Sequence, residues 1–504
     1  MNRRNFLKNC VLSLGTVAFT GCKASATGLN LKNNSVSLAI GKRKPNIIFF
    51  LVDDMGWRDC GFMGSKYYET PNMDKLASQG MIFTNAYANA ANCAPTRACF
   101  LSGKFPMTHG IYTVGSSSRG KSNTRRLIPV TNNDTLATSH TTIAEALKPA
   151  GYTSLSIGKW HMGTNEYSPT GQGFDYNVAG NETGSPKGGY FSPYNNPQLP
   201  DGPDGEYLPD RLTDEAIKFI DKHKEKPFFL YFPHYSVHTP IQAKDDLKAK
   251  YQAKTGDENH FNPTYAAMLD STDQSLGRIM NRLKELKLTE NTIIIFSSDN
   301  GGYGPATLMK PLRGSKGMPY EGGIREPTVI AWPGKIKPGT KCDTPIQTFD
   351  FYPTILDLAS TRKPADKKLD GVSLWPLLQG KTIDREAIYW HSPVYLQKYS
   401  GNMEDARDPL FRTRPVSIIR KGDFKLLMFF EEWLLDGGRE AIATNNSVEL
   451  YDLKNDIGET NNLVNNPSYI ANRDELLDQL LAWQETNNAP NKITDMPKNP
   501  DYVG

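Results

Sequence analysis

Five short apolar runs recur along the first two thirds of the chain, and each has the length of a buried strand. The first, Asn46–Val52, ends abruptly in Asp53-Asp54. Continuous apolar runs of this kind are typical of parallel strands that are buried on both faces. The four later runs are Tyr152–Ile157, Pro227–Phe232, Thr292–Ser297 and Pro327–Trp332.

Between these runs, apolar residues recur at helical spacing, most clearly over residues 210–223 and 263–288. Strands that alternate with helices predict an α/β fold, in which helices cover both faces of a large and mostly parallel sheet. We expect this large domain to span residues 45–384.

The pattern changes after residue 384. Short apolar runs are joined there by turn-like connections such as Lys421-Gly422-Asp423, and an amphipathic helical pattern follows over residues 468–485. The runs are Val416–Arg420, Phe424–Phe430 and Val448–Leu453. We therefore predict a smaller C-terminal subdomain over residues 385–504, built from an antiparallel sheet and a helix.

The first 22 residues have the pattern of an export signal. A basic segment, residues 1–8, precedes a short apolar run, Val11–Phe19, and small residues follow before Cys22. Arg3-Arg4 and the residues around them resemble a twin-arginine signal. This leader predicts a protein that leaves the cytoplasm.

The end of the leader also resembles a bacterial lipobox. In Phe19-Thr20-Gly21-Cys22, cleavage before Cys22 would leave that cysteine as a lipidated first residue. The alternative is a plain signal peptide in which Cys22 is incidental. Residues 23–44 are polar and without period, as expected of a tether. We expect a periplasmic or outer-membrane-anchored lipoprotein that meets the membrane only through this lipid.

Composition narrows the classes of function. Apolar residues make up 38% of the 504 residues, which is too many for a disordered chain. No run approaches the roughly 20 apolar residues of a membrane helix. The net charge is +4, to which the leader contributes through Arg3, Arg4 and Lys8. The remaining chain is close to neutral, which gives no electrostatic reason to expect a nucleic-acid partner.

Few cysteines follow the leader. They are Cys60, Cys93, Cys99 and Cys342. This number is too small for a disulfide scaffold in a chain of this length, although an even number permits a bridge or two. The more interesting possibility is that one of these cysteines carries chemistry.

Two of the predicted strands end in oxygen-bearing side chains. Asp53-Asp54 follow the first strand, and Asp299-Asn300 follow the strand that begins at Thr292. Ligands of open α/β sheets bind at the carboxyl ends of the strands. Three converging carboxylates repel one another unless a cation lies among them, and an all-oxygen set suits Ca²⁺ or Mg²⁺ better than zinc. The alternative is that each pair caps the helix or turn that follows.

A cysteine motif gives the clearest indication of family. Cys93-Ala94-Pro95-Thr96-Arg97 is followed by Leu101-Ser102-Gly103. This segment closely resembles the signature of the type I, formylglycine-dependent sulfatases of the alkaline phosphatase superfamily, which is Cys-x-Pro-x-Arg followed by a Leu-[Ser/Thr]-Gly turn. Thr96 departs from the family's more common Ser or Ala. It keeps a hydroxyl, so we expect slower maturation rather than its loss.

Other segments of the family occur in the right order and extend the resemblance over nearly all of residues 45–384. They are Met55-Gly56-Trp57, Gly158–Gly163, His238-Thr239-Pro240, Ser298–Gly302, Arg313–Gly317, Glu321-Gly322-Gly323 and, nearer the C-terminus, Tyr451-Asp452-Leu453. The resemblance implies an alkaline-phosphatase-like fold and sulfatase activity. It also implies that a formylglycine-generating maturase oxidises Cys93 to formylglycine (3-oxoalanine), whose hydrate is the nucleophile, beside one bound calcium ion per chain.

The resemblance also assigns roles to site residues. The calcium ligands that it implies are Asp53, Asp54, Cys93, Asp299 and Asn300. It places Arg97, Lys159 and Lys316 around the sulfate group, where fixed cations would stabilise the charge that attack on sulfur puts on oxygen. Arg97 lies one helical turn after Cys93, so a helix that starts there holds both on one face, and its N-terminus attracts anions.

Two histidines are implied as proton carriers, since histidine titrates near neutral pH. By resemblance, His238 protonates the departing sugar oxygen, and His161 contacts the formylglycine diol and helps to release sulfate. His234 is a nearby competitor for the first role. We prefer His238 because His-Thr-Pro is the family's form, and we expect His234 to be structural.

Two regions are candidates for substrate specificity. Family members line the substrate pocket with the region that corresponds to Tyr389–Tyr395, which makes His391 a candidate substrate-binding residue. A buried, hydrogen-bonded structural histidine is the alternative. The loop-rich stretch Tyr190–Pro209 is the second region, through its aromatic residues. These residues are Phe191, Tyr194 and Tyr207.

The leading interpretation is a sulfatase that acts on a sulfated carbohydrate, which the export leader and the aromatic loops favour over steroid or lipid substrates. The alternative is a phosphoester or phosphonate monoester hydrolase of the same superfamily. The residues that together favour sulfate are Lys159, His161, His238 and Lys316. A glycan-binding lipoprotein with an inactive site would lack Cys93, Arg97 or the aspartate pairs, all of which are present.

Overall fold

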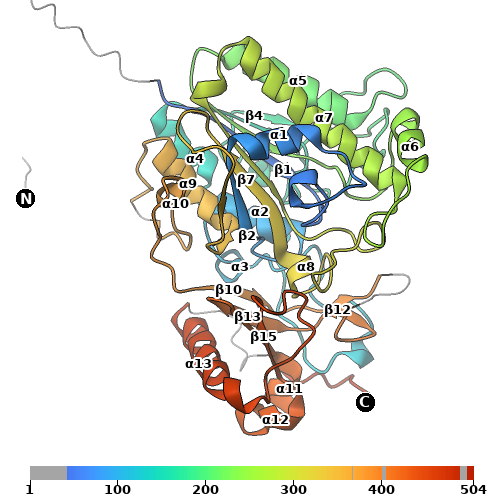
Figure 1. Cartoon of the computed structure of the whole chain (residues 1–504), viewed down its shortest axis with the longest axis vertical. Helices are drawn as coiled ribbons and strands as arrows, with labels where there is room; N and C mark the ends of the chain where they lie inside the picture. Colours follow the sequence, from blue (N-terminus) through green and yellow to red (C-terminus); the bar gives the residue numbers. More distant parts are fainter. Residues whose placement is uncertain (1–42, 366, 400–404, 488–495, 504) are drawn as a thin grey trace, which may run out of the picture. The chain divides into compact units, whose positions relative to one another are not determined.

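The computed structural model describes residues 43–365, 367–399, 405–487 and 496–503, shown in Figure 1. The predicted leader, Cys22 and all but the end of the predicted tether lie outside the described residues. None of the helices in the described part is both long enough and apolar enough to cross a membrane.

Nine strands of the described residues form one large sheet. In order across the sheet they are β4 (Tyr176–Val178), β3 (Thr153–Ile157), β5 (Phe228–Pro233), β1 (Asn46–Val52), β6 (Thr292–Ser298), β7 (Arg325–Ala331), β2 (Met81–Tyr87) and β8 (Thr340–Cys342), with β9 (Ile346–Gln347) also paired to β2. Neighbouring strands run parallel except at β7, which is antiparallel to β6 and β2. The predicted large, mostly parallel sheet is confirmed.

The position of the central strand β1 explains why its sequence is apolar throughout. It lies between β5 and β6, and all of its residues are buried. Ile48 and Phe50 point into one core, whereas Ile47 and Phe49 point into the other. A strand that is buried on both faces needs apolar side chains at successive positions, so it shows no alternation of polar and apolar residues.

Helices cover both faces of this sheet (Figure 1). The helices of this part of the chain are α1 (Pro71–Gln79), α2 (Cys93–Ser102), α3 (Pro106–His109), α4 (Ile143–Leu147), α5 (Leu208–His223), α6 (Asp245–Gln252), α7 (Pro263–Glu285), α8 (Glu321–Ile324), α9 (Phe351–Leu358) and α10 (Trp375–Leu378). Apolar residues of α1, α5 and α7 share the core of Ile48. Those of α2, α4, α9 and α10 share the core of Ile47 on the opposite face.

A second, antiparallel sheet lies toward the C-terminus of the chain. Its strands, in order, are β10 (Ala387–Ser392), β13 (Val416–Lys421), β14 (Phe424–Phe429) and β15 (Val448–Asp452). Helix α13 (Ile470–Thr486) packs against β13 and β14. The other elements of this region are β11 (Leu396–Gln397), β12 (Phe411–Thr413), α11 (Phe430–Leu435) and α12 (Ile442–Asn445). The predicted antiparallel sheet with a helix is confirmed, while the domain boundary after residue 384 stays a prediction.

A buried ion cluster joins the second sheet to the large domain. Lys425 on β14 lies between Glu321, the first residue of α8, and Glu459, with Nζ–carboxylate distances of 3.0 and 2.8 Å. All three side chains are buried, and burial raises the pKa of Glu459 to about 7. Buried charges of this kind persist only when they are paired. Because α8 directly follows the segment that carries Lys316, this cluster anchors that segment.

Candidate active site

The carboxyl ends of β1 and β6 meet at one place. The two strands run parallel with Val52 opposite Ser298, so Asp53-Asp54 and Asp299-Asn300 leave the sheet side by side. Oxygens of the three aspartates lie within 4.8 Å of one another, and all three side chains are buried. Parallel pairing therefore brings together the oxygen ligands that the sequence places at the ends of separate strands.

This oxygen cluster fits a hard cation. Oδ1 of Asp53 and Oδ1 of Asn300 are buried and have no hydrogen-bond partner within the described residues. The Asn300 amide nitrogen donates to Asp54 Oδ1 at 2.8 Å. Burial, and next the charge of the neighbouring Asp299, raise the pKa of Asp53 to about 7. Free acceptor oxygens in a carboxylate cluster are the donors that Ca²⁺ and Mg²⁺ prefer.

Cys93 is the first residue of α2 and lies against this cluster. Its Sγ lies within 4.8 Å of a carboxylate oxygen of Asp53 and a ring nitrogen of His238. The side chain is buried, and burial raises the pKa of its thiol to about 11. In the described part of the chain the free cysteines are Cys60, Cys93, Cys99 and Cys342.

One turn along α2, Arg97 connects three elements. Its Nε donates to Asp299 Oδ2 at 2.8 Å, and its Nη2 lies 2.7 Å from the same oxygen. Its Nη1 donates to the backbone carbonyl of Lys159 at 2.8 Å. Burial lowers the pKa of this guanidinium, but Asp299 and Asp53 raise it by more, so Arg97 stays charged. The side chain ties α2 to the segments that follow β6 and β3.

Two lysines supply the remaining positive charge. Lys159 lies after β3 with Nζ 2.6 Å from Asp53 Oδ2, and Lys316 Nζ lies 2.6 Å from Asp54 Oδ1. Burial by itself would raise the pKa of Asp54, but Lys316 and His238 hold it below its ordinary value. Lys159 is buried, whereas the Lys316 side chain is 12% exposed. The accessible side of the cluster is therefore the side of Lys316.

His161 lies two residues after Lys159, in a backbone conformation with φ of 68° that residues other than glycine rarely adopt. Gly184 passes directly over its ring, since a Cβ at that glycine would lie 2.3 Å from His161 Cε1. The ring Nδ1 is buried without a hydrogen-bond partner in the described residues. Burial and the charges of Lys159 and Arg97 hold the pKa of His161 well below its usual value.

His238 and His234 occupy different environments. The Nδ1 of His238 donates to the Thr239 carbonyl at 2.7 Å, which leaves Nε2 facing Asp54 at 3.8 Å, and the side chain is 17% exposed. Burial, followed by Lys316 and Lys159, lowers the pKa of His238 well below its usual value. His234 is fully buried in the core, stacked on Phe232 at 4.0 Å, and burial lowers its pKa to about 3. Only His238 faces the carboxylate cluster.

The structure places His391 in the interior of the protein. It lies on β10, is 3% exposed, and its Nδ1 pairs with Ser417 Oγ at 2.8 Å. Its ring also packs near Tyr112 and Phe430, with centroid distances of 6.2 and 5.7 Å. This environment favours the structural alternative over contact with substrate, and the substrate-binding role stays a prediction.

Residues 45–361 match the sequence model of the sulfatase family. The chain belongs to the sulfatase family. This is the formylglycine-dependent family of the alkaline phosphatase superfamily, so the protein is a sulfuric ester hydrolase. Residues 315–486 of this sulfatase also match the model of the C-terminal region of N-sulphoglucosamine sulphohydrolase.

Known proteins resemble this sulfatase over most of their length. It is 34% identical to a sulfatase of Formosa agariphila over 90% of both chains. It is 33% identical to human N-acetylgalactosamine-6-sulfatase over 71% of this chain and 70% of that one. The crystal structure of Ps i-CgsB in complex with k-i-k-neocarrahexaose is similar with a TM-score of 0.69 and 28% identity, over 91% of this chain and 96% of that one.

A phosphonate monoester hydrolase of Agrobacterium radiobacter has the same fold. Its structure is similar with a TM-score of 0.63 over 88% of this sulfatase and 96% of that chain, at 18% identity. Fold alone therefore does not separate sulfate from phosphonate esters, and the choice between them depends on the residues of the site.

A second layer of residues supports the site and has no signal in the sequence. Tyr265 on α7 donates to the Asp54 carbonyl at 3.0 Å and to Asp59 Oδ2 at 2.6 Å. Asp59 also accepts from the Gly56 amide at 2.8 Å and from Thr307 Oγ1 at 2.8 Å. These bonds fix the turn that follows β1. No local spacing in the sequence connects Tyr265 with Asp54, which lies more than 200 positions earlier.

In the aromatic stretch Tyr190–Pro209, the side chains of Tyr194 and Tyr207 are buried. A role of this stretch in substrate specificity stays a prediction. Tyr190 has a supporting role, because its hydroxyl donates to the carbonyls of Tyr235 at 2.6 Å and His238 at 2.8 Å. The stretch thus fixes the backbone of the segment that carries His238.

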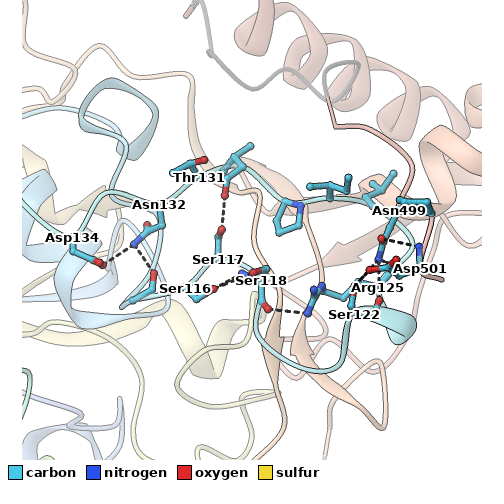
Figure 2. A pocket seen from close by; sticks show the side chains of 16 residues that line it. Ser116, Ser117, Ser118, Ser122, Arg125, Thr131, Asn132, Asp134, Asn499 and Asp501 are labelled. Atoms are coloured by element: carbon cyan, nitrogen blue, oxygen red, sulfur yellow. Dashed lines mark hydrogen bonds between the residues drawn. The ribbon is translucent and has the colours of Figure 1, made fainter.

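A polar groove lies along the segment of residues 115–134 of this sulfatase (Figure 2). Its volume is about 650 Å³, and C-terminal residues 499–501 form its other wall. Consecutive serines, Ser116 to Ser118, line it, and Asn499 holds the two walls together by donating to the carbonyls of Ser122 and Arg125 at 2.9 and 2.8 Å. The groove contains none of the site residues predicted from the sequence.

Proposed function

We propose that this sulfatase hydrolyses a sulfate ester on a carbohydrate, with formylglycine hydrate derived from Cys93 as nucleophile and a bound calcium ion. The observation that carries the proposal is the position of Cys93. It lies at the N-terminus of α2, within 4.8 Å of Asp53 and His238, among cations that pair only with the aspartates in the part of the chain that the structure describes. A sulfate group is the size and charge that such a site would hold.

An unmodified cysteine is unsuited to this position. Burial raises the pKa of the Cys93 thiol to about 11, and a protonated thiol is a poor nucleophile. Oxidation by a formylglycine-generating maturase would give an aldehyde whose hydrate supplies a hydroxyl in place of the thiol. Because Cys93 forms no disulfide with Cys99 or another described cysteine, its side chain is available for that modification.

The cation would be held by the oxygen cluster. Its ligands would be Asp53, Asp54, Asp299, Asn300 and the modified residue 93. The side-chain oxygens of Asp53 and Asn300 that lack a hydrogen-bond partner support this assignment. Among the described residues, the nitrogen and sulfur ligands close to these carboxylates are His238 and Cys93, so oxygen ligands predominate. A bound calcium ion would supply positive charge against the oxygens of the sulfate group.

The fixed cations of the chain would bind and orient the sulfate. Arg97 is held rigidly by Asp299 and the Lys159 carbonyl, so its charge needs no rearrangement during the reaction. Lys159 and Lys316 each contact one aspartate, Lys159 from the segment after β3 and Lys316 from the segment between β6 and α8. Together they would stabilise the negative charge that accumulates on the sulfate oxygens as the ester bond breaks.

The two histidines would handle protons at different atoms. The Nε2 of His238 faces the carboxylate cluster because the Nδ1 of the same ring donates a hydrogen bond to the Thr239 carbonyl. A bound sulfate ester adds negative charge that favours the protonated ring, so Nε2 would give its proton to the departing sugar oxygen. His161, two residues after Lys159, would contact the diol and help to release sulfate from the modified residue, and Asp299 would accept a proton from the diol.

A carbohydrate substrate is supported by the relatives. The human relative is an N-acetylgalactosamine-6-sulfatase, and the structure of Ps i-CgsB was determined with k-i-k-neocarrahexaose. The proposal is tested by incubating the matured enzyme with a panel of sulfated mono- and oligosaccharides, an aryl sulfate and an aryl phosphonate, and measuring the released anion. Sulfate release from a saccharide supports it. Faster turnover of the phosphonate than of every sulfate ester would contradict it.

We also propose that the protein is exported and anchored by a lipid on Cys22. The leader and the lipobox-like Phe19–Cys22 support this location. Expression of the full chain with labelled palmitate should label the membrane fraction, and Cys22→Ser should abolish the label. Secretion of an unlabelled wild-type chain would contradict the anchor and favour a plain signal peptide.

A further inference from the structure

Two arginines close to the catalytic cluster have no carboxylate partner within the described residues. They are Arg119, in the segment of residues 115–134 along which the polar groove lies, and Arg412 on β12. Arg412 is only 7% exposed, and Arg119 is partly buried. The other buried guanidinium of the site, Arg97, is paired with Asp299. Placing two unpaired guanidinium groups in the protein interior costs free energy unless an anion reaches them.

Arg412 lies directly beside the catalytic lysine. Its Nη1 donates to the Lys316 carbonyl at 3.3 Å and its Nε to the Gln397 carbonyl at 2.9 Å. Its guanidinium carbon stacks 3.9 Å from the ring centre of Tyr399, whose hydroxyl donates to the same Lys316 carbonyl at 3.3 Å. A Cβ at Gly317 would lie 2.7 Å from Nη1, so the backbone and the guanidinium are in close contact.

Arg119 contacts the chain close to β11 and β12 through its backbone. Its amide donates to the Tyr395 carbonyl at 3.3 Å, just before β11. A Cβ at the next residue, Gly120, would lie 2.8 Å from the Phe411 ring and 3.7 Å from Gln397. The backbone at Arg119 and Gly120 therefore lies against β11 and β12, the strand pair to which Arg412 belongs.

The charges of these groups act on one another. Burial and the charge of Arg412 lower the pKa of Arg119, while Tyr399, Cys93 and Asp134 have smaller and opposite effects. Asp134 therefore attracts the Arg119 guanidinium less than Arg412 repels it.

We propose, on the basis of the proposed sulfatase function, that Arg119 and Arg412 form a subsite for a second anionic group of the same saccharide, sulfate or carboxylate. Guanidinium groups bind both anions through paired hydrogen bonds. The substrate would thus be a polyanionic saccharide rather than a neutral sugar with a single sulfate. The loop of Arg119 continues into the serines that line the groove in Figure 2, so further sugar residues could extend along it.

Arg412 is a poor test residue, because its bonds also position Lys316. Arg119 is the better one, since among the described side-chain contacts its guanidinium donates only to the Val114 carbonyl. We would compare wild type, Arg119→Gln and Arg119→Lys on N-acetylgalactosamine 6-sulfate, its 4,6-disulfate, and a 6-sulfated disaccharide with and without a uronate. Arg282→Gln is the control, because Arg282 lies on α7 and is paired with Asp221 and Glu285.

We expect wild type to have a higher kcat/KM for the substrates with a second anion, and a preference that weakens as salt increases. Arg119→Gln should lower that kcat/KM by about 10- to 100-fold more than the value for the monosulfated sugar, the range of one charge-assisted hydrogen bond. Arg119→Lys should recover much of the loss, and Arg282→Gln should match wild type. A larger effect with 4,6-disulfate or with uronate identifies the anion.

Equal losses on all substrates would show that Arg119 is structural and would overturn the proposal, as would a wild-type enzyme that prefers the monosulfated sugar. If wild type releases no sulfate from any sugar while it cleaves an aryl phosphonate, the proposed function has failed instead. The two failures are therefore distinguishable.

Discussion

At the scale of single residues, each aspartate of the cluster has its own cation. Asp53 pairs with Lys159, Asp54 with Lys316 and Asp299 with Arg97, at distances of 2.6 to 2.7 Å. The cations are thus held in place before a substrate arrives, and their charge is available to an anion without reorganisation. The loss of any one cation should therefore impair catalysis more than it changes the fold.

Lys159→Met tests this arrangement. Methionine keeps the apolar length of the side chain but removes the charge beside Asp53, so kcat should fall by about 10²–10³-fold, as when one fixed donor is removed from a transition state. Lys218→Met on α5 is the control, because that side chain is 67% exposed and pairs only with Glu215 in the described structure. Steady-state kinetics on an aryl sulfate would measure the kcat of both variants. Near wild-type kcat for Lys159→Met would refute the role.

His238→Ala tests the proton donor. An aryl oxygen leaves without much protonation, whereas a sugar oxygen needs an acid, so the variant should lose about 10²–10⁴-fold on a sulfated sugar and far less on an activated aryl sulfate. His234→Ala is the matched control. His234 packs on Phe50 and Phe232, so its loss should reduce stability and leave the ratio of the two rates unchanged. Equal losses for His238→Ala on both substrates would reject the assignment.

The sequence predicted these residues because each lies in a short motif directly after a strand or at the start of a helix. It did not predict the residues that hold them. Tyr265 reaches Asp54 from the first turn of a long helix, and the segment of Arg119 lies against the strands β11 and β12, of which Arg412 is part. Such contacts depend on tertiary packing, which no local spacing encodes.

At the scale of elements, apolar runs predicted where strands lie but not every strand. In β2, polar Thr84 and Asn85 interrupt the run at a bulge where the pairing with β7 shifts register. In β10 the buried and half-buried positions are mixed, so the strand has no clear period. The direction of β7 was also not predictable, because an apolar run is equally compatible with parallel and antiparallel pairing.

Gly184→Ala tests how a loop positions a catalytic ring. The added methyl would lie 2.3 Å from His161 Cε1 and must displace the imidazole. A displacement of about 1 Å can lower a rate by about 10²-fold, so kcat should fall strongly while the melting temperature changes little. Gly205→Ala serves as the control for kcat: its φ of 77° disfavours alanine and should cost stability, but a Cβ there meets nothing within 4 Å, so kcat should stay unchanged. Wild-type kcat in Gly184→Ala would show that His161 tolerates displacement.

At the scale of the whole molecule, the site joins the two central strands of the sheet to both helical layers. The oxygen cluster ends β1 and β6, Arg97 belongs to a helix on one face, and Tyr265 to a helix on the other. The general architecture was predictable because strands and helices alternate. The tight packing of the C-terminal sheet against the segment of Lys316 was not, since it depends on buried ion pairs between distant residues.

Because the cluster joins these layers, calcium should stabilise the whole domain. Chelation should lower activity and the melting temperature together, and calcium at about 100 times its Kd should restore about 2.7 kcal/mol of stability. Zinc should restore less, because the ligands other than residue 93 are oxygen atoms. Thermal shift with each metal alone measures this. If chelation changed neither the melting temperature nor the activity, this result would contradict a metal at Asp53, Asp54, Asp299 and Asn300.

The central claim is that oxidised Cys93 is the nucleophile, and mass spectrometry of the active enzyme tests it most directly. Trypsin should release residues 76–97, which contain Cys93. We predict the mass of the aldehyde in place of the thiol, in a fraction that rises with specific activity when a maturase is coexpressed, and no activity in folded Cys93→Ala. A fully active enzyme in which Cys93 is entirely a thiol, or entirely bridged to Cys99, would contradict the account.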